Sequence, residues 1–573
     1  MLKNLLMPLL ANFRRRYGPA LLLPCLLFTG FRAAAQPDPA TITINLSQRL
    51  GELRPFWSWF GYDEPNYTNR PYGKKLLSEL TRLGHHPVYV RTHNLLTSKG
   101  MSPGPDLKWG FTNAYSEDSL GRPVYNWTIL DSIIDTYIQR GIKPLMEIGF
   151  MPEALSSKPD PYEHSWSRGG NLWTGWTAPP KDYNKWRELV YQWASHSISR
   201  YGRKEVASWI WEVWNEPNIS YWSGSFEEFC KLYDYAADGL KKACPECRIG
   251  GPHTTSPRSD QALQFLMNFI THCLRGINWA TGKPGTPLEY IGFHAKGSPE
   301  YTDGKIRMNM GAQLNDIQRG FSSLREFPEL KNIPVIIGEC DPEGCAACSA
   351  ARDPRYGYRN GTMYSSYTAA SFARIYELMD SLKVNLQGAV SWSFEFEDQD
   401  WFAGFRELAT HGIDKPVLNV FRMLGKMKGS RLAVQSSQGK SATAIIEQGV
   451  RDQPDIHALA SIQGHNAWIL VWNYHDLDQP APARTVELTL QNLVAKKWKV
   501  RHYRIDQNHS NAFEKWKAMG SPQQVKEEQY RVLERAGQLE ELGPPQSIQR
   551  SPGPARLRFE LPAQGLSLLE ISW

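Results

Sequence analysis

The sequence predicts an α/β fold, a (β/α)8 TIM barrel followed by a C-terminal antiparallel β-sandwich domain. Two observations predict it. Short apolar or β-branched runs alternate with segments of helical period from about residue 85 to 395, and the pattern changes to alternating strands after about residue 428. Repeated strand–helix units with apolar strands indicate a parallel sheet, whereas strict alternation of apolar and polar residues indicates an antiparallel one.

The barrel segment contains eight strand-type runs. In chain order they are "FWSWFGY", "HPVYVRTH", "KPLMEIGF", "WIWEVWNEPN", "RIGGPHTT", "YIGFHAKG", "IPVIIGECDP" and "GAVSWSFEFED". Segments with a helical period lie between them, such as "WTILDSIIDTYIQR" and "SFEEFCKLYDYAADGLKKA". Eight such units favour a closed barrel over an open sheet, and we assign residues 51–428 to it.

The segment 429–573 reads as a sandwich. Its predicted strands are "ATAIIEQ", "AWILVWNYH", "RTVELTLQNL", "WKVRHYRID" and "LRFELPAQGLSLLEISW". The run "TITINLSQ", within residues 36–50, has the same alternation, so we expect this N-terminal strand to join the sandwich rather than the barrel.

Residues 1–35 have the pattern of a secretory signal peptide. A basic cluster, a short apolar run and three alanines follow one another in "NFRRRYGPALLLPCLLFTGFRAAAQ". We predict cleavage near Ala35 and an exported protein, periplasmic or secreted. A membrane anchor fits less well because the apolar run is too short to span a bilayer, and a lipoprotein through Cys25 fits less well because Pro24 precedes it. The rest of the sequence predicts no membrane span.

Length and charge restrict the class of protein. At 573 residues the chain exceeds the usual size of one domain. The formal net charge is +7, but five basic residues lie in the head, which has no acidic residue, and removing it leaves +2. This balance gives no support for a nucleic-acid partner.

Seven cysteines remain after the head, including the pairs in "CPEC" and "CAAC". In an exported protein we favour disulfides, and we expect one of them to hold the loop that follows "IIGEC". The alternative is a tetrahedral zinc site, because Cys-x-x-Cys is a ligand spacing. The odd number predicts one cysteine that is unpaired or shared between chains.

Polar side chains collect where the predicted strands end, which is the C-terminal rim of a barrel. Glu216 and Glu339 each close an apolar run. A pair of carboxylates on one rim is what glycoside hydrolysis requires, one to protonate the departing oxygen and the other to attack or to activate water. The tryptophan-rich run before Glu216 would raise the pKa of this group and suits a proton donor. We expect Trp209 and Trp211 of that run to belong to the barrel core.

The motifs "VRTHNLLT", "EIGFMP", "WEVWNEPN", "IGGP", "FHAKG", "IIGECDP" and "HGIDKPVLNVFRMLGKM" occur in this order along the chain. With them the sequence resembles glycoside hydrolase family 39, a family of retaining (β/α)8 enzymes that includes β-xylosidases and α-L-iduronidases. The resemblance implies a carbohydrate substrate, no metal and no other cofactor. It implies Glu216 as acid/base and Glu339 as nucleophile of a double displacement. It places the other candidate substrate-binding residues around the −1 sugar: Asn215 on its 2-OH, Trp392 beneath it, and Arg91, His93, His294 and Lys296 at its edge, with Glu147 as a supporting partner.

The kind of sugar is less sharply indicated. "FHAKG" and "ECDP" are similar to iduronidase segments, whereas "SWSFEFEDQDWFAGF" is not. We therefore expect a retaining exo-acting glycosidase that removes terminal neutral sugars from oligo- or polysaccharides. The alternatives are an iduronidase-like uronidase and a non-catalytic glycan-binding protein on the same scaffold. Lys296 is either a solvated lysine or a ligand of the sugar.

Overall fold

The computed structural model describes residues 38–85, 87–99, 110–166, 170–392, 394–549 and 553–573, although for 164–166 and 170–172 only the backbone is described. The predicted signal peptide, 1–35, lies outside the described residues. From Pro39 onward the chain forms one compact unit that contains both a barrel and a second sheet. In the described part of the chain, none of the helices combines the length and the apolar character needed to cross a bilayer.

The predicted (β/α)8 barrel is confirmed. Its strand order is β15-β14-β11-β10-β9-β6-β3-β2-β16, and every pairing along this path is parallel. β15 and β16 are two pieces of the eighth strand on either side of Val390, and they pair with β14 and β2 respectively, so the sheet closes on itself. The strands are β2 (Trp59–Tyr62), β3 (Val88–Thr92), β6 (Ile142–Ile148), β9 (Ile210–Val213), β10 (Arg248–Thr254), β11 (Ile291–Lys296), β14 (Val335–Asp341), β15 (Leu386–Ala389) and β16 (Ser391–Trp392).

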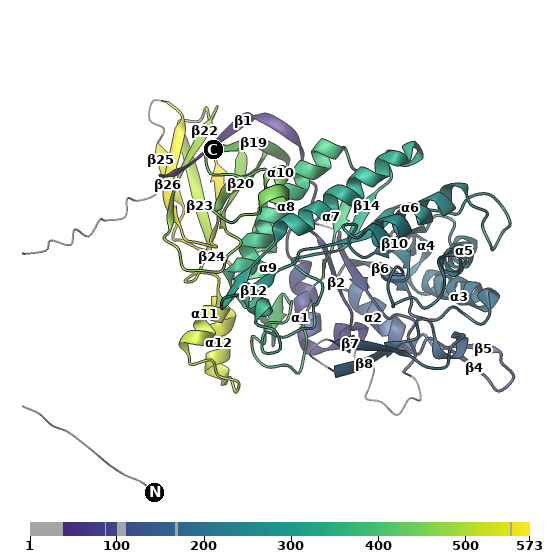
Figure 1. Cartoon of the computed structure of the whole chain (residues 1–573). Helices are drawn as coiled ribbons and strands as arrows, with labels where there is room; N and C mark the ends of the chain where they lie inside the picture. Colours follow the sequence, from purple (N-terminus) through teal and green to yellow (C-terminus); the bar gives the residue numbers. More distant parts are fainter. Residues whose placement is uncertain (1–37, 86, 100–109, 167–169, 393, 550–552) are drawn as a thin grey trace, which may run out of the picture. The chain divides into compact units, whose positions relative to one another are not determined.

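Amphipathic helices surround these strands (Figure 1). α5 shows why they form: Ser225 accepts a hydrogen bond from the Glu228 amide, the Glu228 side chain accepts one from the Ser225 amide, and the helix buries Phe229 and Leu240 against the barrel. The helices of the barrel are α1 (Pro71–Leu80), α2 (Thr128–Ile138), α3 (Tyr183–Tyr201), α4 (Arg203–Val206), α5 (Phe226–Ala243), α6 (Asp260–Arg275), α7 (Met310–Ser323), α8 (Thr362–Leu382) and α9 (Pro416–Lys426).

The C-terminal part has the predicted alternating strands, but hydrogen bonds join all of them into one mixed sheet. The order is β24-β23-β27-β21-β20-β19-β1-β22-β26, with β25 also on β23. β1 pairs antiparallel with β19 and parallel with β22, so the N-terminal strand lies in this second sheet. The strands are β1 (Ala40–Glu52), β19 (Ser430–Ser436), β20 (Asp455–Gln463), β21 (Asn466–Tyr474), β22 (Arg484–Gln491), β23 (Lys497–Ile505), β24 (Glu540–Glu541), β25 (Gln546–Gln549), β26 (Ala555–Leu561) and β27 (Leu566–Ser572).

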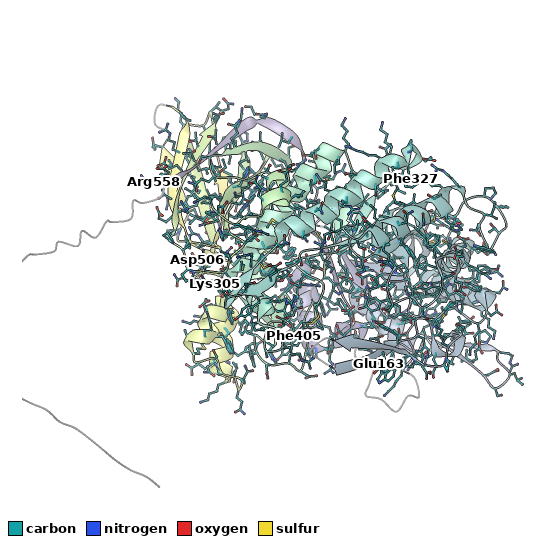
Figure 2. The ribbon with its side chains drawn as sticks, in the orientation of Figure 1. Glu163, Lys305, Phe327, Phe405, Asp506 and Arg558 are labelled. Carbon is teal, nitrogen blue, oxygen red and sulfur yellow. A yellow bond between two sulfur atoms is a disulfide. The ribbon has the colours of Figure 1, made fainter. Side chains whose placement is uncertain are left out.

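The second sheet contributes to two apolar cores. On β21, Ile469 belongs to a core that the sheet builds from its own strands, while its neighbour Trp468 belongs to the large core of the barrel. Period-two alternation places successive side chains on opposite faces, and because both faces pack on a core, the run "AWILVW" is apolar throughout. Helices α8 and α9 contact β21 on the barrel side (Figure 1). Arg558 of β26 belongs to this sheet, whereas Glu163 lies on β7 (Figure 2).

The prediction of a strand at "ATAIIEQ" is wrong. Residues Ala442–Gln448 form helix α10, whose N-terminus is capped by the Ser441 side chain, which accepts a hydrogen bond from the Ala444 amide. The buried residues Ala442 and Ile445 are three apart, a helical spacing, and the helix packs on α7. The remaining elements are α11 (Ala512–Ala518), α12 (Glu527–Ala536) and four two-stranded sheets: β4 (Tyr115–Glu117) with β5 (Pro123–Tyr125), β7 (Tyr162–Trp166) with β8 (Gly170–Gly175), β12 (Glu300–Thr302) with β13 (Lys305–Arg307), and β17 (Ala409–Thr410) with β18 (Ile413–Asp414).

Both Cys-x-x-Cys pairs form disulfides, Cys244–Cys247 and Cys345–Cys348. The expectation of a single unpaired cysteine is wrong, since Cys230, Cys273 and Cys340 are all free and buried. Each of these three lies on a helix or strand whose packing places its thiol in the core, where a cysteine behaves as a small apolar residue.

Candidate active site

Strand register brings the predicted residues to one end of the barrel. His294 of β11 lies opposite Glu339 of β14, and Lys296 opposite Asp341. Glu147 of β6 lies opposite Glu212 of β9. All of these positions are at or near the C-terminal ends of their strands, which is the end where barrel enzymes build their sites.

Glu216 sits in a sharp turn directly after β9. Trp214 and Glu216 have positive φ angles of 71° and 45°, a conformation that costs energy for side chains of this size. The turn is fixed by the Glu216 amide, which donates to the His253 carbonyl at 3.0 Å, and by the Trp214 indole, which donates to the Tyr221 carbonyl at 2.7 Å. It directs the Glu216 carboxyl toward β11, where its Oε1 lies 2.8 Å from Nδ1 of His294.

The surroundings of Glu216 favour its protonated form. Burial, and then the negative charge of Glu339, raises the pKa of Glu216 to about 8. Burial lowers the pKa of His294 well below its usual range, so this partner is neutral at pH 7. Glu216 therefore carries a proton near neutral pH, as the apolar run around it predicts.

Glu339 has the opposite electrostatic environment. Burial alone would raise the pKa of its carboxyl, but the Lys296 ammonium and the Arg91 guanidinium lower it well below its usual range. Lys296 Nζ lies 2.5 Å from Oε2, and Arg91 Nη1 lies 3.3 Å from Oε1. Glu339 is therefore an ionised carboxylate held in a fixed position.

The two glutamates face each other across a short gap. One carboxylate oxygen of Glu216, one of Glu339 and a ring nitrogen of His294 all lie within 4.8 Å of one another. Their side chains are 15 and 8 % exposed, so both reach solvent at the rim. The arrangement places a protonated carboxyl group beside an ionised carboxylate. Cleavage of a glycosidic bond uses a pair of carboxyl groups of this kind.

Arg91 links the pair to the strand beneath it. Its Nε donates to Glu212 Oε1 at 2.8 Å and its Nη2 donates to Asn215 Oδ1 at 3.0 Å, so the amide of Asn215 is oriented beside Glu216. Glu212, which sequence reasoning missed, is completely buried, and its Oε2 also lies 2.8 Å from Nε2 of His253. Its signal in the sequence is a charged residue in the middle of the apolar strand "WIWEVW", which requires a buried partner of opposite charge.

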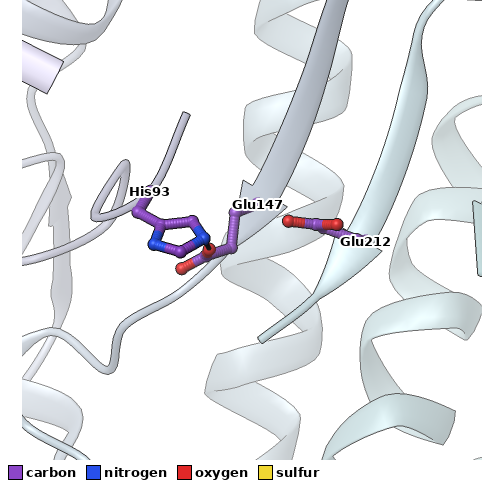
Figure 3. A group of neighbouring side chains, drawn as sticks. All are labelled: His93, Glu147 and Glu212. Carbon is purple, nitrogen blue, oxygen red and sulfur yellow. Dashed lines mark ion pairs between the residues drawn. The ribbon is translucent and has the colours of Figure 1, made fainter. Parts of the chain in front are cut away.

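The side chains of His93, which follows β3, and of Trp392 on β16 meet across β2, the strand between them. The His93 ring lies between two carboxylates, with Nδ1 3.0 Å from Asp63 Oδ1 and Nε2 3.0 Å from Glu147 Oε2. Figure 3 shows the His93 ring beside Glu147. Burial would lower the pKa of His93, but the Glu147 carboxylate outweighs it and the pKa rises to about 9, so the ring is an imidazolium. The Trp392 ring packs on it at 4.2 Å between centroids, with the Arg91 guanidinium 5.0 Å from the centroid of the indole.

Lys296 is not a solvated lysine. Its Nζ lies 2.6 Å from Asp341 Oδ2 as well as 2.5 Å from Glu339, and the residue is 8 % exposed. Asp341 also accepts a hydrogen bond from the Trp392 amide at 2.9 Å and pairs with Arg406 at 3.3 Å. These bonds connect the strand of Glu339 to the strand of the predicted sugar platform.

The loop after Glu339 is held in place by the buried side chain of Arg359. The Arg359 guanidinium donates to the carbonyls of Cys345 and Cys348 at 2.6 and 2.7 Å, so it holds both ends of the disulfide turn. The same guanidinium pairs with Glu343 at 2.7 Å, and Glu343 also pairs with Arg406. A series of buried ion pairs thus runs from this loop to Asp341 and Lys296.

Two groups of side chains have donor atoms close enough together for a metal: His93, Glu147 and Glu212 in one, and Glu216, His294 and Glu339 in the other. In the first, His93 is protonated and Glu212 is paired with Arg91. In the second, Glu339 is paired with Lys296. Because metal ligands must be deprotonated and available, these contacts favour the chain's own cations over a metal.

The sequence is similar to a known protein family and to known proteins. The model of "Glycosyl hydrolases family 39" matches residues 40–547. A β-xylosidase of Caldicellulosiruptor saccharolyticus is 30% identical over 513 residues, 87% of this chain and 91% of the relative. An α-L-iduronidase of Mus musculus is 24% identical over 588 residues, 95% of this chain and 83% of the relative.

Solved structures share the fold. A monomeric β-xylosidase from Caulobacter crescentus CB15 has a TM-score of 0.70 at 22% identity, and the match covers 93% of this chain and 99% of that one. The GH39 enzyme from Xanthomonas axonopodis pv. citri has a TM-score of 0.71 at 21% identity, with 95 and 99% covered. The family match extends over most of the sequence and includes every candidate residue at the rim, so the chain belongs to glycosyl hydrolase family 39 and is a glycosidase.

Proposed function

We propose that this glycosidase acts on terminal neutral sugars with retention of configuration, with Glu216 as acid/base and Glu339 as nucleophile. The observation that supports it most is the pair itself: two carboxyl groups with oxygens within 4.8 Å, one protonated and one ionised near pH 7. Retaining glycosidases separate these groups by about 5 Å, whereas inverting enzymes leave a wider gap of roughly 6.5 to 9.5 Å for a water molecule.

The charges around the pair favour a neutral sugar. Each nearby cation already contacts two carboxylates: Arg91 contacts Glu212 and Glu339, His93 contacts Asp63 and Glu147, and Lys296 contacts Glu339 and Asp341. A uronate would bring a further carboxylate to groups that are already neutralised, at a desolvation cost that no new ion pair offsets. This disfavours the uronidase alternative, although the motif "FHAKG" resembles iduronidases.

The names of the relatives point the same way. β-Xylosidases of Caldicellulosiruptor saccharolyticus and Geobacillus stearothermophilus are 30 and 26% identical to this chain, and the murine α-L-iduronidase is 24% identical. A xyloside is therefore the first substrate to test. A panel of 4-nitrophenyl glycosides of xylose, arabinose, galactose, fucose, glucuronic acid and iduronic acid, in both anomeric forms, tests the proposal. Turnover of a neutral glycoside supports it, and turnover of uronides alone contradicts it.

The pH profile should depend on the leaving group. Glu216 has a raised pKa, so its proton is present below about pH 8 and is lost as the pH rises through that value. We expect kcat/KM for an alkyl glycoside to fall above about pH 8 and to fall on the acid side only well below pH 4.5, where Glu339 protonates. For a dinitrophenyl glycoside, which needs no proton, the alkaline decline should be weak. The same alkaline decline for both leaving groups would contradict the role of Glu216.

Lys296→Ala should affect neutral substrates through Glu339. Removal of the ammonium disfavours the ionised carboxylate, so the pKa of Glu339 should rise and the acid limb of kcat/KM should move to higher pH. We expect kcat/KM on a neutral glycoside to fall, by an amount that corresponds to a loss of about 1 to 3 kcal/mol in transition-state stabilisation.

The control is Lys305→Ala, which removes an exposed lysine of β13 (Figure 2). A loss of about 2 to 5 kcal/mol confined to a uronide would instead indicate that Lys296 binds a substrate carboxylate. An unchanged pH profile on every substrate would show that Lys296 has no role in holding Glu339 ionised.

We also propose that the protein is exported after cleavage near Ala35. The support is the order of basic cluster, apolar run and alanines in the first 35 residues. Expression of the full-length chain should give an exported protein whose N-terminal sequence begins at Gln36. Recovery of the uncleaved chain, or of a chain that begins at a lipidated Cys25, would contradict this cleavage site.

A further inference from the structure

Asp63 belongs to the rim, although no motif in the sequence marks it as a functional residue. It is the first residue after β2, the strand on which the barrel closes. Tyr62 of β2 lies opposite Thr92 of β3, and Gly61 lies opposite Trp392 of β16. Asp63 therefore lies beside His93, the residue after Thr92, on one side. On the other side it lies two positions beyond the residue that pairs with Trp392.

The Asp63 carboxylate contacts both of these neighbours. Oδ1 lies 3.0 Å from His93 Nδ1, and Oδ2 accepts a hydrogen bond from the Trp392 indole at 3.3 Å. Each carboxylate oxygen accepts about two hydrogen bonds, so these contacts use roughly half of its capacity. The side chain is 17 % exposed, compared with 15 % for Glu216 and 8 % for Glu339, so Asp63 reaches solvent at the rim at least as much as the two glutamates do.

Neutralising His93 does not require Asp63. Glu147 is completely buried and already pairs with the other ring nitrogen at 3.0 Å, so the imidazolium has a counter-charge beneath it. The group of three side chains, Asp63, His93 and Glu147, has two carboxylates for one cation. The excess negative charge of this group lies on Asp63, the carboxylate that reaches solvent. Hydrogen-bond donors of a ligand can therefore bind to it there.

The position of Asp63 in the barrel separates it from Asn215. In the sheet order β9-β6-β3-β2, two strands lie between the strand before Asn215 and the strand before Asp63. A sugar that rests on Trp392 would therefore meet Asn215 and Asp63 from different sides. If Asn215 binds the 2-OH, Asp63 is placed for hydroxyls elsewhere on the ring.

We propose that Asp63 is a substrate-binding residue that accepts hydrogen bonds from the 3-OH or 4-OH of the −1 sugar and so selects sugars that carry these hydroxyls. This rests on the proposed function. It adds a specificity determinant on the first strand of the barrel, fixed in orientation by His93 and Trp392.

The test compares Asp63→Ala with the wild-type enzyme on 4-nitrophenyl β-xyloside and its 3-deoxy and 4-deoxy analogues; if the panel identifies another neutral sugar, the same analogues of that glycoside are used. Wild type should prefer the parent over one of the analogues by about 10- to 100-fold in kcat/KM, the range for a hydrogen bond to a charged group. In Asp63→Ala this preference should fall to about threefold or less, because the partner of the missing hydroxyl is gone. Asp452→Ala, an exposed aspartate before β20, is the control and should keep the wild-type preference.

A role in supporting His93 alone would lower kcat/KM on all three substrates equally and leave the preference intact, and that result would overturn the inference. If Asp63→Ala does not fold, the test uses Asp63→Asn instead. This variant keeps a neutral acceptor, so the preference for the parent substrate should weaken several-fold. An unchanged preference would count against the proposal. Turnover of the glycosides by the wild-type enzyme is measured first. No turnover of any glycoside refutes the proposed function, whereas turnover without preference among the analogues refutes only the role of Asp63.

Discussion

Glu339→Ala is expected to abolish turnover, and added azide is expected to restore it by forming a glycosyl azide of inverted configuration. Removal of a nucleophile leaves the first displacement without an attacking atom, and losses on the order of 10⁴-fold or more are typical for such groups. A small anion fits the space of the deleted carboxylate and can attack the anomeric carbon while Glu216, still protonated near pH 7, assists departure of the leaving group.

The control for this experiment is Glu528→Ala, an exposed glutamate of α12, which should turn over substrate like the wild type. The azide product is identified by NMR. Two results would show that Glu339 is not the nucleophile. One is an azide adduct that forms with the wild-type enzyme but not with Glu339→Ala. The other is hydrolysis by Glu339→Ala at a rate comparable with that of the control.

Glu216→Ala is expected to separate substrates by leaving group. Alkyl glycosides need a proton on the departing oxygen and should lose about 10²- to 10⁴-fold in kcat/KM. Dinitrophenyl glycosides leave without protonation and should lose less than about tenfold. Because the same residue would act as base in the second step, the variant should release a burst of dinitrophenolate and then turn over slowly.

The comparison uses a series of aryl glycosides with leaving groups of graded pKa. The variant should show a much steeper dependence of kcat/KM on that pKa than the wild type does. Equal losses on alkyl and dinitrophenyl glycosides would show that Glu216 is not the proton donor.

The sequence predicts the barrel and the pair of glutamates for the same reason. Strands buried on both faces are apolar throughout, so a carboxylate at the end of such a run, as in "WNEP" and "IIGEC", marks a strand end at the rim. The structure places Glu216 and Glu339 there and brings His294 and Lys296 to them.

The supporting residues are harder to predict because their roles depend on partners that are distant in sequence. Glu212 precedes Glu216 by four residues, yet its partner Arg91 lies on another strand, 121 positions away. Asp63 follows an ordinary aromatic strand, and only the closure of β2 on β16 brings it to Trp392. The sequence predicts a strand where helix α10 forms, because a stretch of seven residues with four apolar side chains fits either period, and packing on α7 decides between them.

The central claim, a double displacement through Glu339, is tested most directly by the configuration of the first product. The wild-type enzyme is mixed with 4-nitrophenyl β-xyloside, or with the neutral glycoside that the panel identifies, and the anomeric proton is followed by NMR before mutarotation. We predict that the first sugar released has the anomeric configuration of the substrate. First appearance of the opposite anomer would mean a single displacement by water, and the assignment of Glu339 as nucleophile would be wrong.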